Sequence, residues 1–342
     1  MSNSTFDPNG PATNTENLFG LPYSISDADL VVIPVPWEVT VSSGSGTSNA
    51  PKKVLQSSLQ VDLYDADIAE SWKSRIVFDK FPANIYDTGR QLNDKARKLS
   101  GRINEATGTE EINRACDEMV KWVKTRSSQL LGEGKRVATL GGDHSTCLGL
   151  IQALGEFHES FSILQIDAHA DLRKSYCGFK NSHASIMHNA MKLQQVNRLV
   201  QVGIRDLCGE EAEQIQESDN IITYFDSAYR ERLFKGDTWA NIVDEIVSTL
   251  GPQVYVSFDV DGLSPALCPN TGTLVPGGLE FQEAIYLLKK VGESKDIIGF
   301  DLSETGIGSV DGNVSARLLY KMANLSLAGI KSPPHIDIVF HM

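Results

Sequence analysis

The chain has 342 residues, of which 41% are hydrophobic and 22% charged, and its formal net charge is −13 at pH 7. The apolar content is sufficient for a folded core, whereas the negative balance excludes nucleic acids and anionic membranes as partners and suits a small cationic substrate. Five scattered cysteines without a Cys-x-x-Cys spacing, no leader peptide and no long apolar run predict a cytoplasmic protein with reduced thiols and no membrane span.

The hydrophobic pattern predicts an N-terminal arm over residues 1–27, a single α/β domain over 28–330 and a C-terminal tail over 331–342. Strands alternate with helices along the domain, which predicts a three-layer, doubly wound and mostly parallel sheet with helices on both faces. The arm and the apolar residues of the tail are candidates for contact with a neighbouring subunit. The expected strands are 29–35, 84–88, 136–140, 162–167, 199–204, 221–225, 254–259 and 297–301, and the expected helices are 51–60, 109–133, 145–156, 183–194, 209–217, 237–250, 280–292 and 314–327.

Carboxylates and imidazoles follow three of these predicted strands. Residues two apart in an extended chain point to the same face, and the carboxyl ends of parallel strands meet at one edge of a sheet. Each cluster alone could cap a helix, but three in this order predict two hard divalent cations, which offset the repulsion between the carboxylates. The clusters are Asp143 and His144, then Asp167, His169 and Asp171, then Asp259 and Asp261.

With these motifs the chain resembles the ureohydrolases, the family of arginase and agmatinase, and most of all the bacterial agmatinase-like proteins. The matching segments are 141–145, 167–173, 257–265 and 299–304, and the resemblance extends over roughly residues 28 to 328. It implies a binuclear site, with Mn²⁺ as the expected metal and Ni²⁺ as the alternative, in a homo-oligomer, a trimer or a hexamer. It also implies that His144, Asp167, Asp171 and Asp259 bind one ion, that His169, Asp167, Asp259 and Asp261 bind the other, and that Asp167 and Asp259 bridge the two.

Hydrolysis of a guanidino carbon–nitrogen bond to urea and an amine needs a proton for the leaving nitrogen and an anion to hold the guanidinium. His183, in Asn-Ser-His-Ala-Ser, matches the histidine of the family and is the predicted proton donor; a histidine without chemistry at a helix start is the alternative. Glu304 matches the guanidinium-binding glutamate, against the alternative of a carboxylate at a helix N-terminus. Asp143 is expected to support the site by orienting a ligand or a loop.

The sequence restricts the choice of substrate only in part. Arg173 stands where arginases have asparagine, and the run from Arg205 to Cys208 lacks the aspartate that reads an α-amino group, so arginine is disfavoured. Agmatine is the leading substrate. If Cys177 replaces a glutamate that pairs with Arg173, the arginine is released to bind a carboxylate, as in guanidinobutyrate or formiminoglutamate; free or N-alkylated guanidine are further alternatives. A non-catalytic subunit of the same fold, a phosphoesterase and a nucleophilic Cys177 are the alternatives of other classes.

Overall fold

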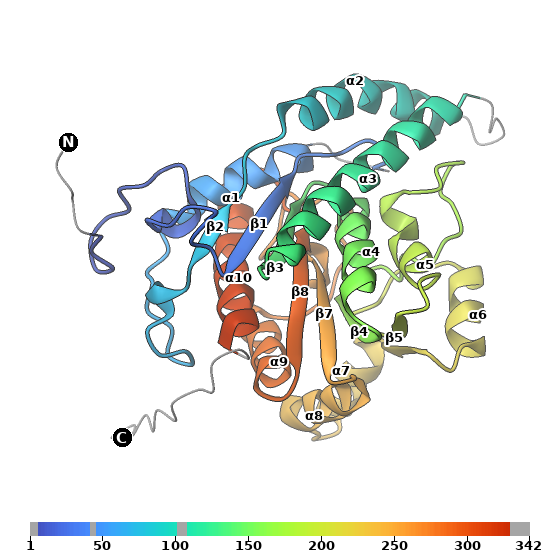
Figure 1. Ribbon diagram of the computed structural model, residues 1–342. Helices are drawn as coiled ribbons and strands as arrows, with labels where there is room; N and C mark the ends of the chain where they lie inside the picture. The colour runs from blue at the N-terminus through green and yellow to red at the C-terminus, as the bar shows by residue number, and fades with distance from the viewer. Residues whose placement is uncertain (1–5, 42–45, 101–107, 329–342) are drawn as a thin grey trace.

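The computed structural model describes residues 6–41, 46–100 and 108–328. In this part of the chain eight strands form one parallel sheet in the order β2-β1-β3-β8-β7-β4-β5-β6 (Figure 1). The predicted α/β fold class is thereby confirmed. The strands are β1 (Leu30–Val35), β2 (Ile76–Phe78), β3 (Arg136–Gly141), β4 (Phe161–Ile166), β5 (Val196–Val202), β6 (Ile221–Tyr224), β7 (Gln253–Asp259) and β8 (Asp296–Ser303).

Helices cover both faces of the sheet. On one face α1, α8, α9 and α10 pack into a core, and on the other α2, α3, α4 and α5 build a second core; Figure 1 shows α3 and α4 lying across the strands. The helices are α1 (Ala50–Ser58), α2 (Ala83–Ser100), α3 (Glu110–Gly132), α4 (Leu148–Phe157), α5 (Ile186–Ala190), α6 (Gly209–Glu217), α7 (Asp226–Phe234), α8 (Trp239–Thr249), α9 (Phe281–Ser294) and α10 (Ser309–Ala328).

The two cores follow from the alternation of side chains along each strand. In β1 the side chains of Val31 and Ile33 enter one core, whereas those of Leu30 and Val32 enter the other. A parallel strand with helices on both sides is buried on both faces, which is why it reads as a continuous apolar run in the sequence. The same property leaves its carboxyl end as the place where polar side chains can reach solvent and ligands.

The expected strand at 84–88 is wrong. These residues belong to α2, and the short strand lies earlier, at Ile76–Phe78. Pro82 precedes the helix, and Ile85, Leu92 and Ala96 are buried at helical spacing, so the period of three to four residues decided the structure of this segment. The helix expected at 183–194 is also shorter: a 3₁₀ turn at His183–Ser185 leads into α5.

The described part of the N-terminal segment packs against the body of the same chain. Leu18 and Leu21 are buried in the core, and Asn17 donates to the carbonyl of Ile76 and accepts from the amide of Phe78, at distances of 3.2 and 2.8 Å. Contact of the arm with another subunit stays a prediction, and the tail at 331–342 lies outside the described residues. Across residues 6–41, 46–100 and 108–328, no helix is both long and apolar enough to cross a membrane.

Candidate metal centre

The sheet brings the three predicted clusters to one edge. In the ladders, Ile166 of β4 pairs with Phe258 of β7, and Asp259 pairs with Ser303 of β8. The next residue after β4 is Asp167 and the next after β8 is Glu304, so carboxylates emerge side by side from neighbouring strands. The fourth contributor, His144, begins the 3₁₀ turn that follows β3.

His144 lies at the centre of the first group of side chains. Its Nδ1 atom is 2.9 Å from Asp171, 3.1 Å from Asp167 and 3.4 Å from Asp259, measured in each case to a carboxylate oxygen. This nitrogen is buried, yet no described residue forms a well-aligned hydrogen bond with it. Three carboxylate oxygens lie close to one ring nitrogen without well-aligned hydrogen bonds to it. Side chains that bind a shared cation are arranged in this way, because each directs a donor atom toward the same point.

The second group shares Asp167 with the first. His169 Nδ1 lies 3.1 Å from Asp261 Oδ2 and 3.5 Å from Asp167 Oδ1. Asp261 is fixed by the amide of Ala168, which donates to its other oxygen at 3.0 Å. The structure therefore assembles the six side chains proposed as ligands into two adjoining groups, with Asp167 common to both.

Backbone geometry at the edge of the sheet is unusual. Asp171 and Glu304 both adopt positive φ, 54° and 60°, although neither is glycine. Left-handed backbone at residues other than glycine is costly and concentrates at functional sites. Gly262, in turn, lets two strand ends approach closely: a Cβ atom at this position would lie 2.6 Å from the amide nitrogen of Asp167.

The protonation equilibria of the groups fit the same interpretation. Burial, followed by the charge of Asp167, raises the pKa of Asp171 to about 7, and burial with Asp261 raises the pKa of Asp259 well above its usual range. Against the opposing effect of burial, Asp167 and Asp261 raise the pKa of His169 to about 12. Without bound cations these groups retain protons, because protonation reduces the repulsion between neighbouring carboxylates. Divalent cations would replace those protons. The oxygen-rich donor set with two imidazoles fits two such ions.

A pocket opens beside the second group of ligands. His169, Asp171, Arg173, Tyr176 and His183 line it, and the ring of His183 packs edge-on against that of Tyr176 at 5.8 Å between centroids. Burial, and then the neighbouring His169 and His144, lower the pKa of His183 to about 4. The imidazole of His183 is therefore neutral at pH 7.

Asp143 and Glu304 lie beneath the cluster, and neither lines this pocket. Asp143 accepts hydrogen bonds from the amide and the hydroxyl of Ser145, and these bonds form the turn that presents His144. Glu304 accepts from the amide of His144 at 3.0 Å. Burial raises the pKa of Asp143 to about 6, and burial together with the charge of Asp143 raises that of Glu304 well above its usual range.

Arg173 has an acidic neighbour in the structure. Its Nε atom lies 3.7 Å from Glu211 Oε2, and its guanidinium group stacks over the ring of Tyr176 at 5.5 Å. Glu211 is itself fixed, because the amides of Leu172 and Cys208 donate to its two oxygens at 3.0 and 2.9 Å. An acidic neighbour for Arg173 is thus supplied by α6, far away in sequence, and binding of a substrate carboxylate by Arg173 stays a prediction.

Cys177 lies apart from this pocket lining. The amide and carbonyl groups of Tyr176 and Phe179 bond to each other at 2.9 and 3.0 Å, and Cys177 and Gly178 form the tip of the turn between them. Both tip residues have positive φ, 50° and 80°, as a type I′ turn requires. Cys177 is exposed and occupies the tip of a turn.

Sequence reasoning missed a buried amide network under the second cluster. Gln165 donates to Asp167 Oδ2 at 2.8 Å and to the carbonyl of His169 at 3.1 Å. Its own oxygen accepts from Gln201 at 2.6 Å, and Gln201 accepts from Thr223 at 2.8 Å. The available signal was a glutamine near the carboxyl end of each of two apolar strands, since buried polar groups need partners.

Comparison with known proteins places this geometry in a family. A sequence profile described as "Arginase family" matches residues 28–323. The chain belongs to the Arginase family. This assignment makes it a metal-dependent hydrolase of amidino carbon–nitrogen bonds, as predicted from its motifs. Among its relatives, the N(1)-aminopropylagmatine ureohydrolase of Synechocystis is 30% identical over 87% of this chain and 89% of its own length. The agmatinase of Shigella sonnei is 30% identical over 83% and 81%.

Solved structures show the same fold for this arginase-family chain. The proclavaminate amidino hydrolase of Streptomyces clavuligerus superimposes with a TM-score of 0.72 and 21% identity, over 94% of this chain and 99% of that one. The agmatine ureohydrolase of Thermoplasma volcanium gives a TM-score of 0.70 and 20% identity, over 92% and 96%. At this level of identity the likeness concerns the fold.

Proposed function

We propose that the protein is a binuclear metal hydrolase that converts a small guanidino compound, in the first place agmatine, to urea and an amine. The observation that carries the proposal is the convergence of three carboxylate oxygens on His144 Nδ1, next to a second group that shares Asp167. Two divalent cations bound there would supply hydroxide at neutral pH by lowering the pKa of water.

The residues that would hold the ions divide into two sets. His144, Asp171, Asp167 and Asp259 would hold one ion, and His169, Asp261, Asp167 and Asp259 the other. Mn²⁺ is the proposed metal and Ni²⁺ the alternative, because oxygen and imidazole ligands accept both. None of these ligands is a cysteine, which disfavours zinc.

His183 is proposed to move the proton. Its lowered pKa leaves the ring unprotonated at neutral pH, so a ring nitrogen has a lone pair that can take up a proton as the attacking water is consumed and return it to the leaving nitrogen. Glu304, which accepts from the amide of His144 and does not line the pocket, is proposed to bind the guanidinium because it matches the guanidinium-binding glutamate of the family. Asp143 acts indirectly, by forming the turn on which His144 lies.

The charges at the mouth of the pocket favour a substrate with a second cation. The positive charge of Arg173 is countered by the buried Glu211, whereas Asp206 lines the same pocket with its side chain 67% exposed. A guanidino acid would bring a carboxylate toward Asp206, and an aminoalkyl guanidine would bring an ammonium group. This is the argument for agmatine over guanidinobutyrate, with free or N-alkylated guanidine as the remaining alternatives.

Urea release from the purified protein, loaded with Mn²⁺ or with Ni²⁺, tests the proposal. The substrates are agmatine, arginine, guanidinobutyrate and free guanidine, with formiminoglutamate assayed separately for formamide, and agmatine should give the highest kcat/KM. Because Asp206 also lies 3.9 Å from His169 Nε2, the comparison is made at saturating metal. In the Asp206→Asn variant, KM for agmatine should then rise by about 2- to 5-fold, the effect of an exposed ion pair, whereas turnover of free guanidine should change less. No urea from any guanidine, with metal bound, would contradict the proposed reaction.

A further inference from the structure

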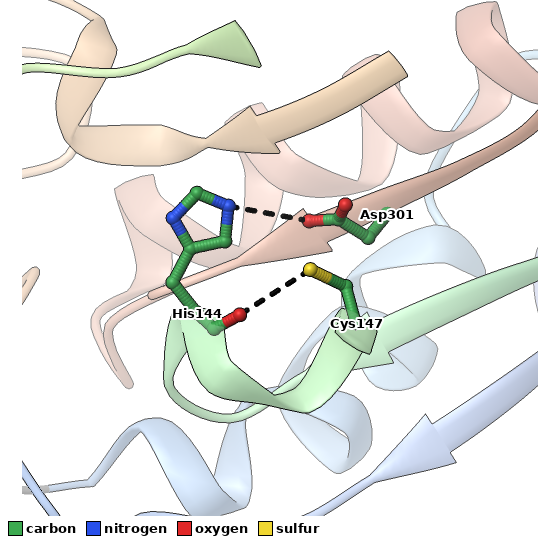
Figure 2. A group of neighbouring side chains, drawn as sticks. All are labelled: His144, Cys147 and Asp301. Carbon is green, nitrogen blue, oxygen red and sulfur yellow. Dashed lines mark hydrogen bonds and ion pairs between the residues drawn. The ribbon is translucent and has the colours of Figure 1, made fainter. Parts of the chain in front are cut away.

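A second polar cluster lies on the side of His144 that faces away from the carboxylates. Figure 2 shows the Nε2 atom of His144 directed toward Asp301, at 3.8 Å, and the thiol of Cys147 directed toward the carbonyl of His144. All three side chains are buried. The proposed reaction assigns no role to Asp301, and a carboxylate in such a place needs a reason, because burying a charge is costly.

Hydroxyl groups surround this carboxylate. Tyr255 and Ser257 donate to Asp301 Oδ1 at 2.7 and 2.8 Å, and Ser303 donates to Oδ2 at 3.0 Å. The register explains the contact, because Ser257 of β7 and Asp301 of β8 are ladder partners. Asp301 is thus an acceptor on both of its oxygens, and the hydrogen of Ser257 is committed to it.

The direction of the hydrogen bond between Ser257 and Asp301 determines the direction of the bond between Ser257 and His144. Ser257 Oγ also lies 2.8 Å from His144 Nε2. A hydroxyl has one hydrogen, so a serine that donates to Asp301 must accept from His144. In the neutral imidazole, the form that binds a cation, the one proton is then held on Nε2 and the lone pair is left on Nδ1. Nδ1 is the nitrogen around which Asp167, Asp171 and Asp259 converge.

Side chains of one strand, β7, lie next to both ring nitrogens of His144. Side chains two residues apart on β7 share a face, so Tyr255, Ser257 and Asp259 lie in a row. Ser257 meets Nε2, and Asp259 Oδ2 lies 3.4 Å from Nδ1. The cluster is not a cation site of its own, because the thiol of Cys147 bonds to a backbone carbonyl and burial raises its pKa well above the usual range.

We propose that Asp301 is a positioning residue which, through Ser257, holds the proton of His144 on Nε2 and so presents Nδ1 to a divalent cation. The inference rests on the proposed metal site. Removing a hydrogen-bond partner of a metal-binding histidine lowers metal affinity by about 10- to 100-fold in known sites.

The test is titration of the metal-free protein with Mn²⁺, followed by calorimetry and by the loss of the free-ion signal in electron paramagnetic resonance. Ser257→Ala and Asp301→Asn should each weaken one bound ion by about 10- to 100-fold and leave the other unchanged. Ser257→Thr keeps the hydroxyl and should bind both ions as the wild type does. Tyr255→Phe is the matched control, since Tyr255 contacts the same oxygen of Asp301 without contacting His144.

The outcomes separate the two proposals. Wild-type affinity in Ser257→Ala would overturn the positioning role while leaving the metal site in place. An equal loss in Tyr255→Phe would also overturn it, because the effect would then be one of general packing. If the wild type binds no Mn²⁺ or Ni²⁺, the proposed function fails and the positioning role with it. Should Asp301→Asn not fold, the serine variants decide alone.

Discussion

The protonation state of His183 constrains the chemistry of the site. A pKa of about 4 lies below the ordinary value of 6.5, so between these values the unfolded chain binds more protons than the folded one. The contribution of this residue to stability is therefore complete above pH 6.5 and is lost as the pH falls toward 4. At neutral pH the ring is unprotonated, so it must first take up a proton before it can give one to the leaving nitrogen.

Replacing His183 with asparagine should remove the shuttle and leave the pocket. We expect kcat for agmatine to fall by about 10²- to 10⁴-fold with KM changed little, since general acid–base groups contribute in this range. Urea release measured from pH 5 to 9 checks this. Because His183 is neutral throughout that range, its titration should not appear in the wild-type profile. An unchanged kcat in the variant would exclude His183 from catalysis.

At the residue scale, the sequence predicted the types and positions of the site residues better than it predicted which side chains they contact. The six proposed ligands could be found because all of them follow predicted strands, and five of them, all except His144, lie in a spacing of two. The pairing of Arg173 with Glu211 could not, because it depends on how α6 packs against the loop after β4. The part played by Ser257 was hidden for a similar reason: a serine in a buried strand has no distinctive pattern, and its role depends on which hydroxyl donates to which oxygen.

Among the elements, the loop after β7 depends on a residue without a side chain. Gly262 directly follows the ligand Asp261 and lies against the backbone at Ile166 and Asp167. Backbone atoms cannot turn aside as the end of a flexible side chain can. The close approach of these two strand ends, which brings Asp167 near Asp261, therefore requires glycine.

Gly262→Ala should accordingly destabilise the fold and weaken Mn²⁺ binding together. We expect a loss of about 1–3 kcal/mol in the free energy of unfolding, the usual cost of overpacking a filled site. Gly209→Ala is the control: a Cβ at Gly209 would have no neighbour within 4 Å. Urea denaturation and Mn²⁺ titration of both variants check this, and equal behaviour of the two would refute the steric argument.

The elements themselves were predictable where the apolar pattern was long. Strands β3 to β8 lie within a few residues of the expected positions, because most of them are buried apolar runs, although β6 is only half-buried. The short edge strand β2 was misplaced into α2, since a run of three apolar residues carries little information and Ile85 and Tyr86 imitate it. The helix α7 was not expected; its surfaces are mostly polar, and Tyr229 is its buried residue.

For the whole molecule, cation binding and folding should be linked. The groups that would hold the ions come from the ends of β4 and β7 and from the turn after β3, so they meet only in the folded chain. Ligands that bind the native state alone stabilise it by about 2.7 kcal/mol when present at 100 times their Kd. Adding Mn²⁺ should therefore raise Tm by several degrees, and chelation should reverse the shift.

Asp259→Asn provides the control for this linkage. Asp259 belongs to both proposed ligand sets, so the variant should lose most of the shift in Tm and the release of urea. Differential scanning calorimetry with and without Mn²⁺ measures the first, and the urea assay the second. A shift as large as that of the wild type would mean that the stabilising ions bind elsewhere.

The ladder between β4 and β7 pairs Ile166 with Phe258 and thus places Asp167 level with Asp259. If β7 slipped by one residue, its side chains would exchange faces, and Asp259 would turn away from His144. Two central strands of similar apolar composition offer little else to distinguish neighbouring registers. The positions of the carboxylates therefore depend on the correct register of the sheet. A chain that folds with β7 out of register should fail to bind metal, so metal binding reports on the register.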